Sequence, residues 1–70
     1  MSAWPSTKAK LVLAALERIG WKVLRQKGSH RTLGREGYEN VVFAFHDGDE
    51  IGPIMLAKIA KVTGLKPEDL

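Results

Sequence analysis

The chain has 70 residues, no cysteine and a net charge of +3 at pH 7. A chain of this length forms one small domain and buries only about 60% of its unfolded surface, so any site is expected on an open surface rather than in an enclosed cavity. The missing cysteine excludes disulfides and thiolate chemistry, and a hydrophobic fraction of 44% argues against disorder.

The first expected element is a helix over about residues 7–19. Ser6 or Thr7 can cap its N-terminus, and the apolar residues from Val12 to Ile19 follow the 3.6-residue spacing of a helix. Gly20 is a natural end for this helix.

Three strands are expected next, at residues 21–26, 29–33 and 38–45. Lys27 and Gly28 supply a tight turn between the first two strands, and the sequence "GREG" at residues 34–37 connects the second to the third. The third strand is the most apolar, which predicts a central position in the core.

A polar loop at residues 46–52 leads to a second helix that begins at Pro53 and ends at Gly64. The order α-β-β-β-α predicts a single α+β domain over residues 1–70, with its core at about 7–65. Two hairpins make a three-stranded antiparallel sheet, and both helices are expected on one face of it. The opposite face is left to solvent or a ligand.

The positive charge is concentrated in the first half of the chain. Residues 1–35 carry eight cations against Glu17, a net charge of +7, whereas residues 36–70 have a net charge of −4. A one-sided basic field attracts polyanions, so this asymmetry favours a nucleic-acid partner.

The sequence "GWKVLRQKGSHR" at residues 20–31 resembles the signature of the HicA (YcfA-like) messenger-RNA interferase toxins, and "LAKIAKVTGL" at 56–65 resembles the second helix of that family. The resemblance covers about residues 7–65. It implies a fold like that of double-stranded-RNA-binding domains, and RNA cleavage without a metal by the histidine of the Gly-Ser-His motif, here His30. It also implies neutralisation by a HicB antitoxin.

Metal-free RNA cleavage requires proton transfer and stabilisation of an anion. Histidine suits the proton transfer at neutral pH, and lysine and arginine suit the anion. With a turn at residues 27–28, Arg25 is expected nearly opposite His30 across the first hairpin. Without the resemblance, a lone histidine in a basic stretch is more often structural or a phosphate contact. The resemblance implies His30 as the catalytic general acid or base, and the predicted RNA- or phosphate-binding residues are Arg25, Lys27, Ser29 and Arg31.

The other polar groups predict no metal site and no cofactor. A calcium loop starting at Asp47 fails because Ile51 and Lys58 stand at two ligand positions.

His46 is expected about 13–16 Å from His30 at ~3.3 Å per strand residue, too far for the two histidines to act on one phosphate.

Aromatic side chains divide into two groups. Trp21, Phe43 and Phe45 are expected in the core, whereas Trp4 and Tyr38 are candidates for stacking on bases.

The predicted function is that of the toxin of a type II toxin–antitoxin system, an endoribonuclease whose partners are mRNA and a HicB-like antitoxin. No signal peptide and no stretch of ~20 apolar residues is found, so a soluble, cytoplasmic protein without membrane contact is expected.

Two alternative functions remain open. One is a non-catalytic RNA-binding module that uses the same basic face, and the other is a protein-interaction domain whose open sheet face docks a partner.

Overall fold

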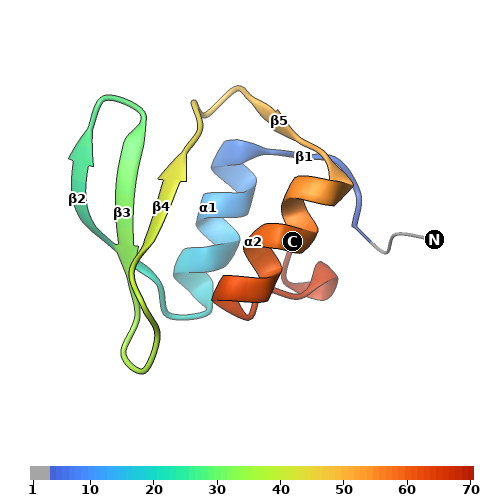
Figure 1. The fold of residues 1–70 in the computed structure, drawn as a ribbon. Helices are drawn as coiled ribbons and strands as arrows, with labels where there is room; N and C mark the ends of the chain where they lie inside the picture. The colour runs from blue at the N-terminus through green and yellow to red at the C-terminus, as the bar shows by residue number, and fades with distance from the viewer. Residues whose placement is uncertain (1–3) are drawn as a thin grey trace.

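The computed structural model describes residues 4–70, as a small α+β fold with two sheets (Figure 1). A three-stranded antiparallel sheet has the order β2-β3-β4, and β1 pairs with β5 in a separate two-stranded sheet. The elements are β1 (Thr7–Lys8), α1 (Ala9–Arg18), β2 (Lys22–Lys27), β3 (His30–Gly34), β4 (Val41–Ala44), β5 (Glu50–Ile51), α2 (Pro53–Thr63) and the 3-10 helix η1 (Pro67–Asp69).

The predicted α+β class is confirmed, and the sheet of β1 and β5 is an addition that the sequence pattern does not predict. The likeness to double-stranded-RNA-binding domains stays a prediction. The single-domain prediction for residues 1–70 includes residues 1–3, which lie outside the described part of the chain, and it also stays a prediction.

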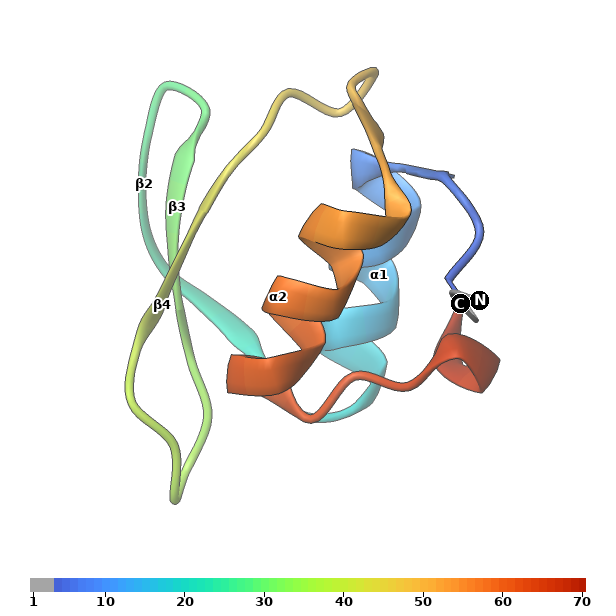
Figure 2. The same cartoon turned by 45° about the vertical axis from the view of Figure 1, so that its right-hand side comes forward.

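Both helices lie on the same side of the three-stranded sheet, as two views of the molecule show (Figures 1 and 2). Between them is one hydrophobic core, to which the sheet contributes Leu33 and Phe43 and the helices contribute Leu16 and Leu56, all almost fully buried. The buried indole N–H of Trp21 donates a hydrogen bond to a carbonyl at the end of α2, 3.1 Å away. Among residues 4–70, no helix lies on the other face of the sheet (Figures 1 and 2).

The start of α1 differs from the sequence prediction. Thr7 and Lys8 pair with Ile51 and Glu50, so the helix begins at Ala9 rather than at residue 7. Neither predicted capping side chain acts as a cap, and the Thr7 hydroxyl donates to Pro5 instead. No side-chain cap is needed, because the N–H groups of Ala9 and Lys10 donate to backbone carbonyls of the loop at residues 47–49.

The first hairpin closes through Gly28 and Ser29. Gly28 has a φ of +60° and Ser29 has no positive φ, which is the pattern of a type II′ turn with glycine at its first central position. Lys27 therefore pairs with His30, and Arg25 pairs with Thr32. The prediction that Arg25 stands nearly opposite His30 is wrong, because the turn lies one residue later than expected. Lys27 takes that place, and Arg25 lies opposite Thr32. A bulge at Leu24 then shifts the register.

The second connection is longer than predicted. It spans residues 35–40 rather than 34–37, so β4 begins at Val41 and His30 pairs with Ala44 instead of residue 41 or 42. The cause is tertiary: the Tyr38 ring packs edge-on against Trp21 at 5.4 Å and lies under the Arg35 guanidinium at 4.7 Å, which holds Tyr38 out of the strand.

The second helix agrees with the prediction at both ends. Pro53 occupies the first turn of α2, and Gly64 follows the helix in the left-handed conformation at φ +76°. Across residues 4–70, neither helix has the length and apolar character needed to cross a membrane.

Candidate functional site

The uncovered side of the three-stranded sheet is a grid of side chains, which we call the outer face. Alternate residues of a strand point to opposite faces, so His30, Thr32 and Gly34 of β3 belong to the outer face. The strand register adds their neighbours in three rows: Lys27, His30 and Ala44; Arg25, Thr32 and Val42; and Lys22 with Gly34.

An open hollow of about 600 Å³ surrounds His30 on this face. Its lining comes from β2, β3 and β4 and consists of Arg25, Gln26, Lys27, His30, Thr32 and Val42. Because His30 and Lys27 are directly paired across the hairpin, their side chains leave the sheet on the same side as neighbours. Most of the lining residues are exposed to solvent, so a polymer can lie across the hollow.

The two cations beside His30 are free to bind an anion. Within residues 4–70, neither Arg25 nor Lys27 forms an ion pair or a side-chain hydrogen bond. Both are exposed, and no acidic side chain lines the hollow. An anion such as a phosphate therefore meets two unpaired positive charges next to an imidazole.

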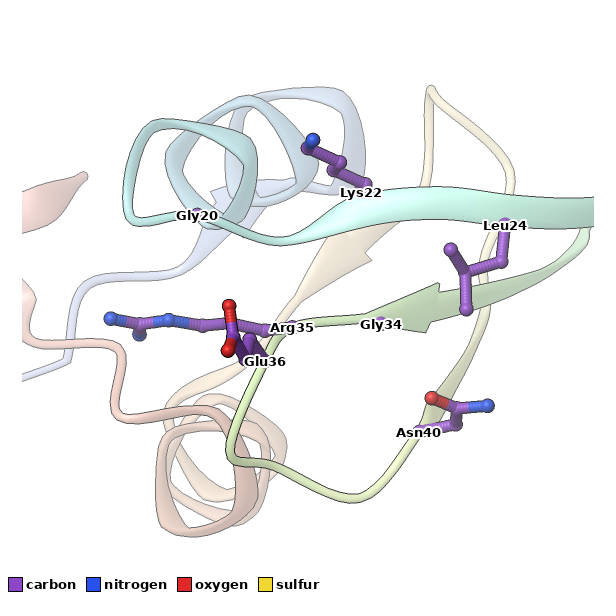
Figure 3. A pocket seen from close by; sticks show the side chains of 7 residues that line it. All are labelled: Gly20, Lys22, Leu24, Gly34, Arg35, Glu36 and Asn40. Carbon is purple, nitrogen blue, oxygen red and sulfur yellow. The ribbon is translucent and has the colours of Figure 1, made fainter.

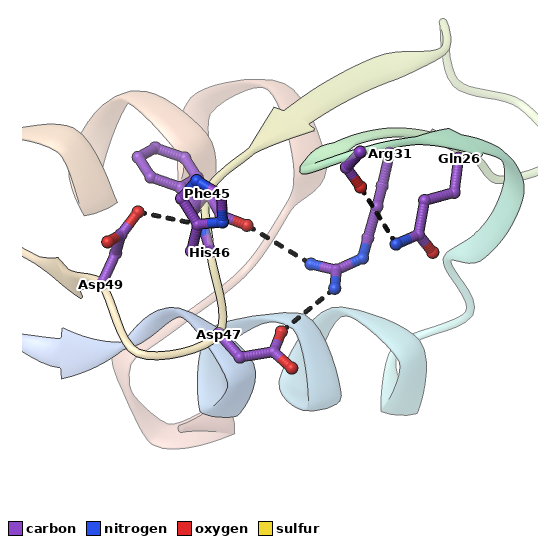
Figure 4. Close-up of polar contacts among 7 residues, drawn as sticks. Gln26, Arg31, Phe45, His46, Asp47 and Asp49 are labelled. Carbon is purple, nitrogen blue, oxygen red and sulfur yellow. Dashed lines mark hydrogen bonds and ion pairs between the residues drawn. The ribbon is translucent and has the colours of Figure 1, made fainter.

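Arg31, the third predicted cation, is not brought together with His30. It is on the opposite, helix-facing side of β3, with only 14% of its side chain exposed. Its guanidinium donates to the Phe45 carbonyl at 3.4 Å and to the Asp47 carboxylate at 3.1 Å (Figure 4). Arg31 thus ties the loop after β4 to the sheet. Arg31 is predicted beside His30 because the two residues are adjacent in sequence. In a strand, adjacent residues point to opposite faces, so their side chains lie apart.

Ser29 stands at the tip of the hairpin as the second residue of the turn, partly buried. The turn is held by the Gln26 amide, which donates to the Gly28 carbonyl at 3.2 Å. A side chain added at Gly28 would meet nothing within 4 Å, so the tip of the hairpin is open to solvent.

The strand register behind the prediction for His46 is wrong. His46 follows Ala44, the partner of His30, by only two residues, fewer than the estimate of 13–16 Å assumes. The chain has left the sheet by then: the His46 N–H donates to the Asp49 carboxylate at 2.9 Å, and the Asp49 N–H donates back to the His46 carbonyl at 3.0 Å. His46 does not line the hollow around His30.

No group of three or more histidine, cysteine or acidic side chains gathers to hold a metal ion in the part of the chain from residue 4 onward. The carboxylates of Asp47 and Asp49 already bind Arg31 and the backbone of His46. Both serve the loop after β4 rather than a ligand.

The aromatic residues follow the predicted division only in part. Trp21 and Phe43 are buried in the core, and Phe45 is partly buried with its ring 5.0 Å from that of Phe43, as predicted. Trp4 also packs against the core, and the half-exposed Tyr38 is engaged by Trp21 and Arg35. Neither Trp4 nor Tyr38 lines the hollow around His30.

Sequence reasoning missed the other end of the outer face. Lys22, Gly34 and the neighbouring Asn40 lie there around a second hollow. A glycine inside a strand is the signal that could have located it, because a missing side chain marks a close approach or an opening.

The fold and the outer face define a small α+β protein with an open, basic sheet surface around one histidine. The family model for HicA toxins of bacterial toxin–antitoxin systems matches residues 9–65 of the 70. The chain therefore belongs to the HicA toxin family, which implies a toxin that acts within a toxin–antitoxin pair. Neither a curated protein nor a solved structure matches this chain.

Proposed function

We propose that this toxin is a metal-independent endoribonuclease that binds and cleaves mRNA, with His30 as its general acid or base. One observation carries the proposal: on the outer face, His30 stands beside two cations, Lys27 and Arg25, that have no partner within residues 4–70. His30 is also the histidine of the Gly-Ser-His motif through which the sequence resembles the HicA toxins.

The reaction uses the RNA's own ribose as the nucleophile. The 2′-oxygen attacks the adjacent phosphorus, its proton passes to a base, and the bond to the 5′-oxygen breaks as that oxygen takes up a proton. The products are a 2′,3′-cyclic phosphate and a 5′-hydroxyl. His30 performs one of the two proton transfers.

The cations act on the phosphate. Lys27 stands opposite His30 in the register and is proposed to stabilise the negative charge that builds on the phosphorane. Arg25 is one pair further along and is proposed to hold the phosphate, with the Ser29 hydroxyl donating a hydrogen bond from the hairpin tip. Arg31 has no part in this site, because its guanidinium is occupied by Asp47 and Phe45.

The partner proposed for control is a HicB-like antitoxin, and the compartment is the cytoplasm, where mRNA is translated. The open, cationic outer face has no segment of residues 4–70 that covers it, so inhibition is proposed to come from a second chain that presents carboxylates.

The decisive experiment removes the imidazole. Purified protein with excess EDTA should cut single-stranded RNA and leave 2′,3′-cyclic phosphate ends. His30→Ala should still bind RNA but cut it about 10²–10⁴-fold more slowly, the usual contribution of general acid–base catalysis. His46→Ala is the matched control and should keep its activity, because His46 does not line the hollow. Full cleavage by the His30→Ala variant would contradict the assignment.

A non-catalytic RNA-binding module is the second candidate, since the same unpaired cations suffice for binding. It predicts that the wild-type protein binds RNA and leaves it intact, with His30→Ala no different from wild type.

A further inference from the structure

The outer face does not end at the hollow around His30. A second open hollow of about 480 Å³ lies over its third row (Figure 3). Leu24 of β2 and Asn40, the residue before β4, approach Gly34 from either side. The complete lining is Gly20, Lys22, Leu24, Gly34, Arg35, Glu36 and Asn40.

The last residue of β3, Gly34, lets its neighbours come close to the strand. A Cβ added at Gly34 would lie 2.5 Å from the Leu24 Cδ1 and 3.2 Å from the Asn40 Oδ1, so these two side chains close in where a larger residue would stand. The bulge in β2 inserts Leu24 here as an extra residue, and its side chain is 59% exposed. The hollow therefore has an apolar wall on a face that is otherwise largely polar.

Two polar side chains of this hollow, Asn40 and Lys22, have no partner within residues 4–70. The Asn40 amide makes no hydrogen bond within residues 4–70, and Lys22 forms no ion pair there. An amide offers one donor and one acceptor side by side, which is the pattern that matches the edge of a nucleobase. Lys22 supplies a positive charge for the adjoining phosphate.

We propose that the hollow over Gly34 is a nucleobase subsite, and that Asn40 is a specificity-determining residue for RNA bound across the outer face. One base packs on the Leu24 side chain, and the Asn40 amide hydrogen-bonds to the edge of that base. The inference rests on the proposed function, because it takes the RNA to pass His30 as well.

The geometry fixes where the selected base lies. Gly34 is four residues from His30 along β3, about 13 Å at ~3.3 Å per residue. A stacked strand rises about 3.4 Å per nucleotide, so this span holds up to four nucleotides, and fewer if the RNA is extended. The selected base should therefore be two to four nucleotides from the cut.

The test is a cleavage-site profile on a random single-stranded RNA pool, read by sequencing the product ends. Wild-type protein should show a preference of at least about 5-fold for one base at one position two to four nucleotides from the cut, since a good side-chain-to-base pair discriminates by that much or more. Asn40→Ala should reduce this preference to below about 2-fold. An Asn40→Ala profile identical to the wild-type profile would overturn the subsite.

A second variant changes the hollow and leaves residue 40 as asparagine, with its added Cβ 2.5 Å from the Leu24 Cδ1 and 3.2 Å from the Asn40 Oδ1. Gly34→Ala has no positive φ to strain it, and the atom it displaces most is the tip of the exposed Leu24 side chain. It should weaken the same positional preference. Gly48→Ala is its control, because a Cβ there meets nothing within 4 Å, and it should keep the wild-type profile.

Binding separates this inference from the cleavage mechanism. In the His30→Ala background, fluorescence titration with homopolymeric RNA oligonucleotides should show affinities that differ among the bases, and adding Asn40→Ala should remove the difference. Base-dependent binding without cleavage by the wild type would remove the proposed nuclease but keep the subsite. If the protein cleaves RNA with a positional preference that neither Asn40→Ala nor Gly34→Ala changes, the proposed subsite is contradicted and the proposed nuclease is not.

Discussion

Neighbouring residues of β3 have different environments because they lie on opposite faces of the sheet. On the inner face, Leu33 is fully buried and Arg31 is paired with Asp47. On the outer face, His30 is exposed beside Arg25 and Lys27, which have no partner in the described part of the chain, residues 4–70. Arg31 and His30 are adjacent in sequence, yet one stabilises the fold and the other faces the solvent. Residue type alone does not decide whether a cation in this motif serves structure or ligand binding, because the parity of its position in the strand decides it.

The largest test of this contrast compares Leu33→Ala with Thr32→Ala. Deleting the buried Leu33 side chain should lower the free energy of unfolding by about 2–5 kcal/mol, through lost apolar contact and the cavity left behind. Thr32→Ala, on the outer face, should cost less than about 1 kcal/mol. Urea denaturation followed by circular dichroism measures both, and equal losses would contradict the division into two faces.

The next test compares cations on the two faces. If RNA is held mainly through phosphates, replacing Arg25 and Lys27 together by alanine should reduce the slope of log affinity against log salt by about 1.4, or roughly 0.7 per contact with a single strand. Fluorescence anisotropy at several salt concentrations measures this slope.

Arg31→Ala is the matched control for that pair. It should leave the salt slope unchanged and instead lower the free energy of unfolding by about 1–3 kcal/mol, because Phe45 and Asp47 lose their hydrogen-bond donor. A reduced salt slope in Arg31→Ala, or an unchanged slope in the double variant, would place the RNA on another surface.

The smallest expected effect concerns the antitoxin. If an acidic antitoxin sits on the outer face, Arg25→Ala should weaken it by about 1.4- to 5-fold, the range of one exposed ion pair. RNA and antitoxin should also displace each other in a fluorescence titration. A ternary complex with unchanged RNA affinity would show that the antitoxin binds elsewhere.

The elements were predictable from sequence where local signals define them. Gly20 and Gly64 end the helices, Pro53 starts α2, and the turn at Gly28 belongs to a hairpin that local chemistry specifies. These features depend on residues within a turn or two of one another.

Register and facing could not be predicted in the same way. The place where β4 begins depends on Tyr38 packing against Trp21, 17 residues earlier in the chain. The sheet of β1 and β5 has two residues per strand, too few for an alternating pattern, and is formed by segments far apart in sequence. The first contact sets the register in which His30 pairs with Ala44, and so the geometry of the candidate site. The second shortens α1.

The bulge and the cations of β2 also bear on how this protein meets other copies of itself. β2 is an edge strand of six exposed residues, and an exposed edge is a template for pairing with a strand of another molecule. Here Lys22, Arg25 and Lys27 put like charges along that edge, and the bulge at Leu24 breaks its hydrogen-bonding repeat. If the cations of β2 bind RNA as proposed, variants that neutralise them should weaken RNA binding and also remove one of the two features that oppose edge-to-edge aggregation.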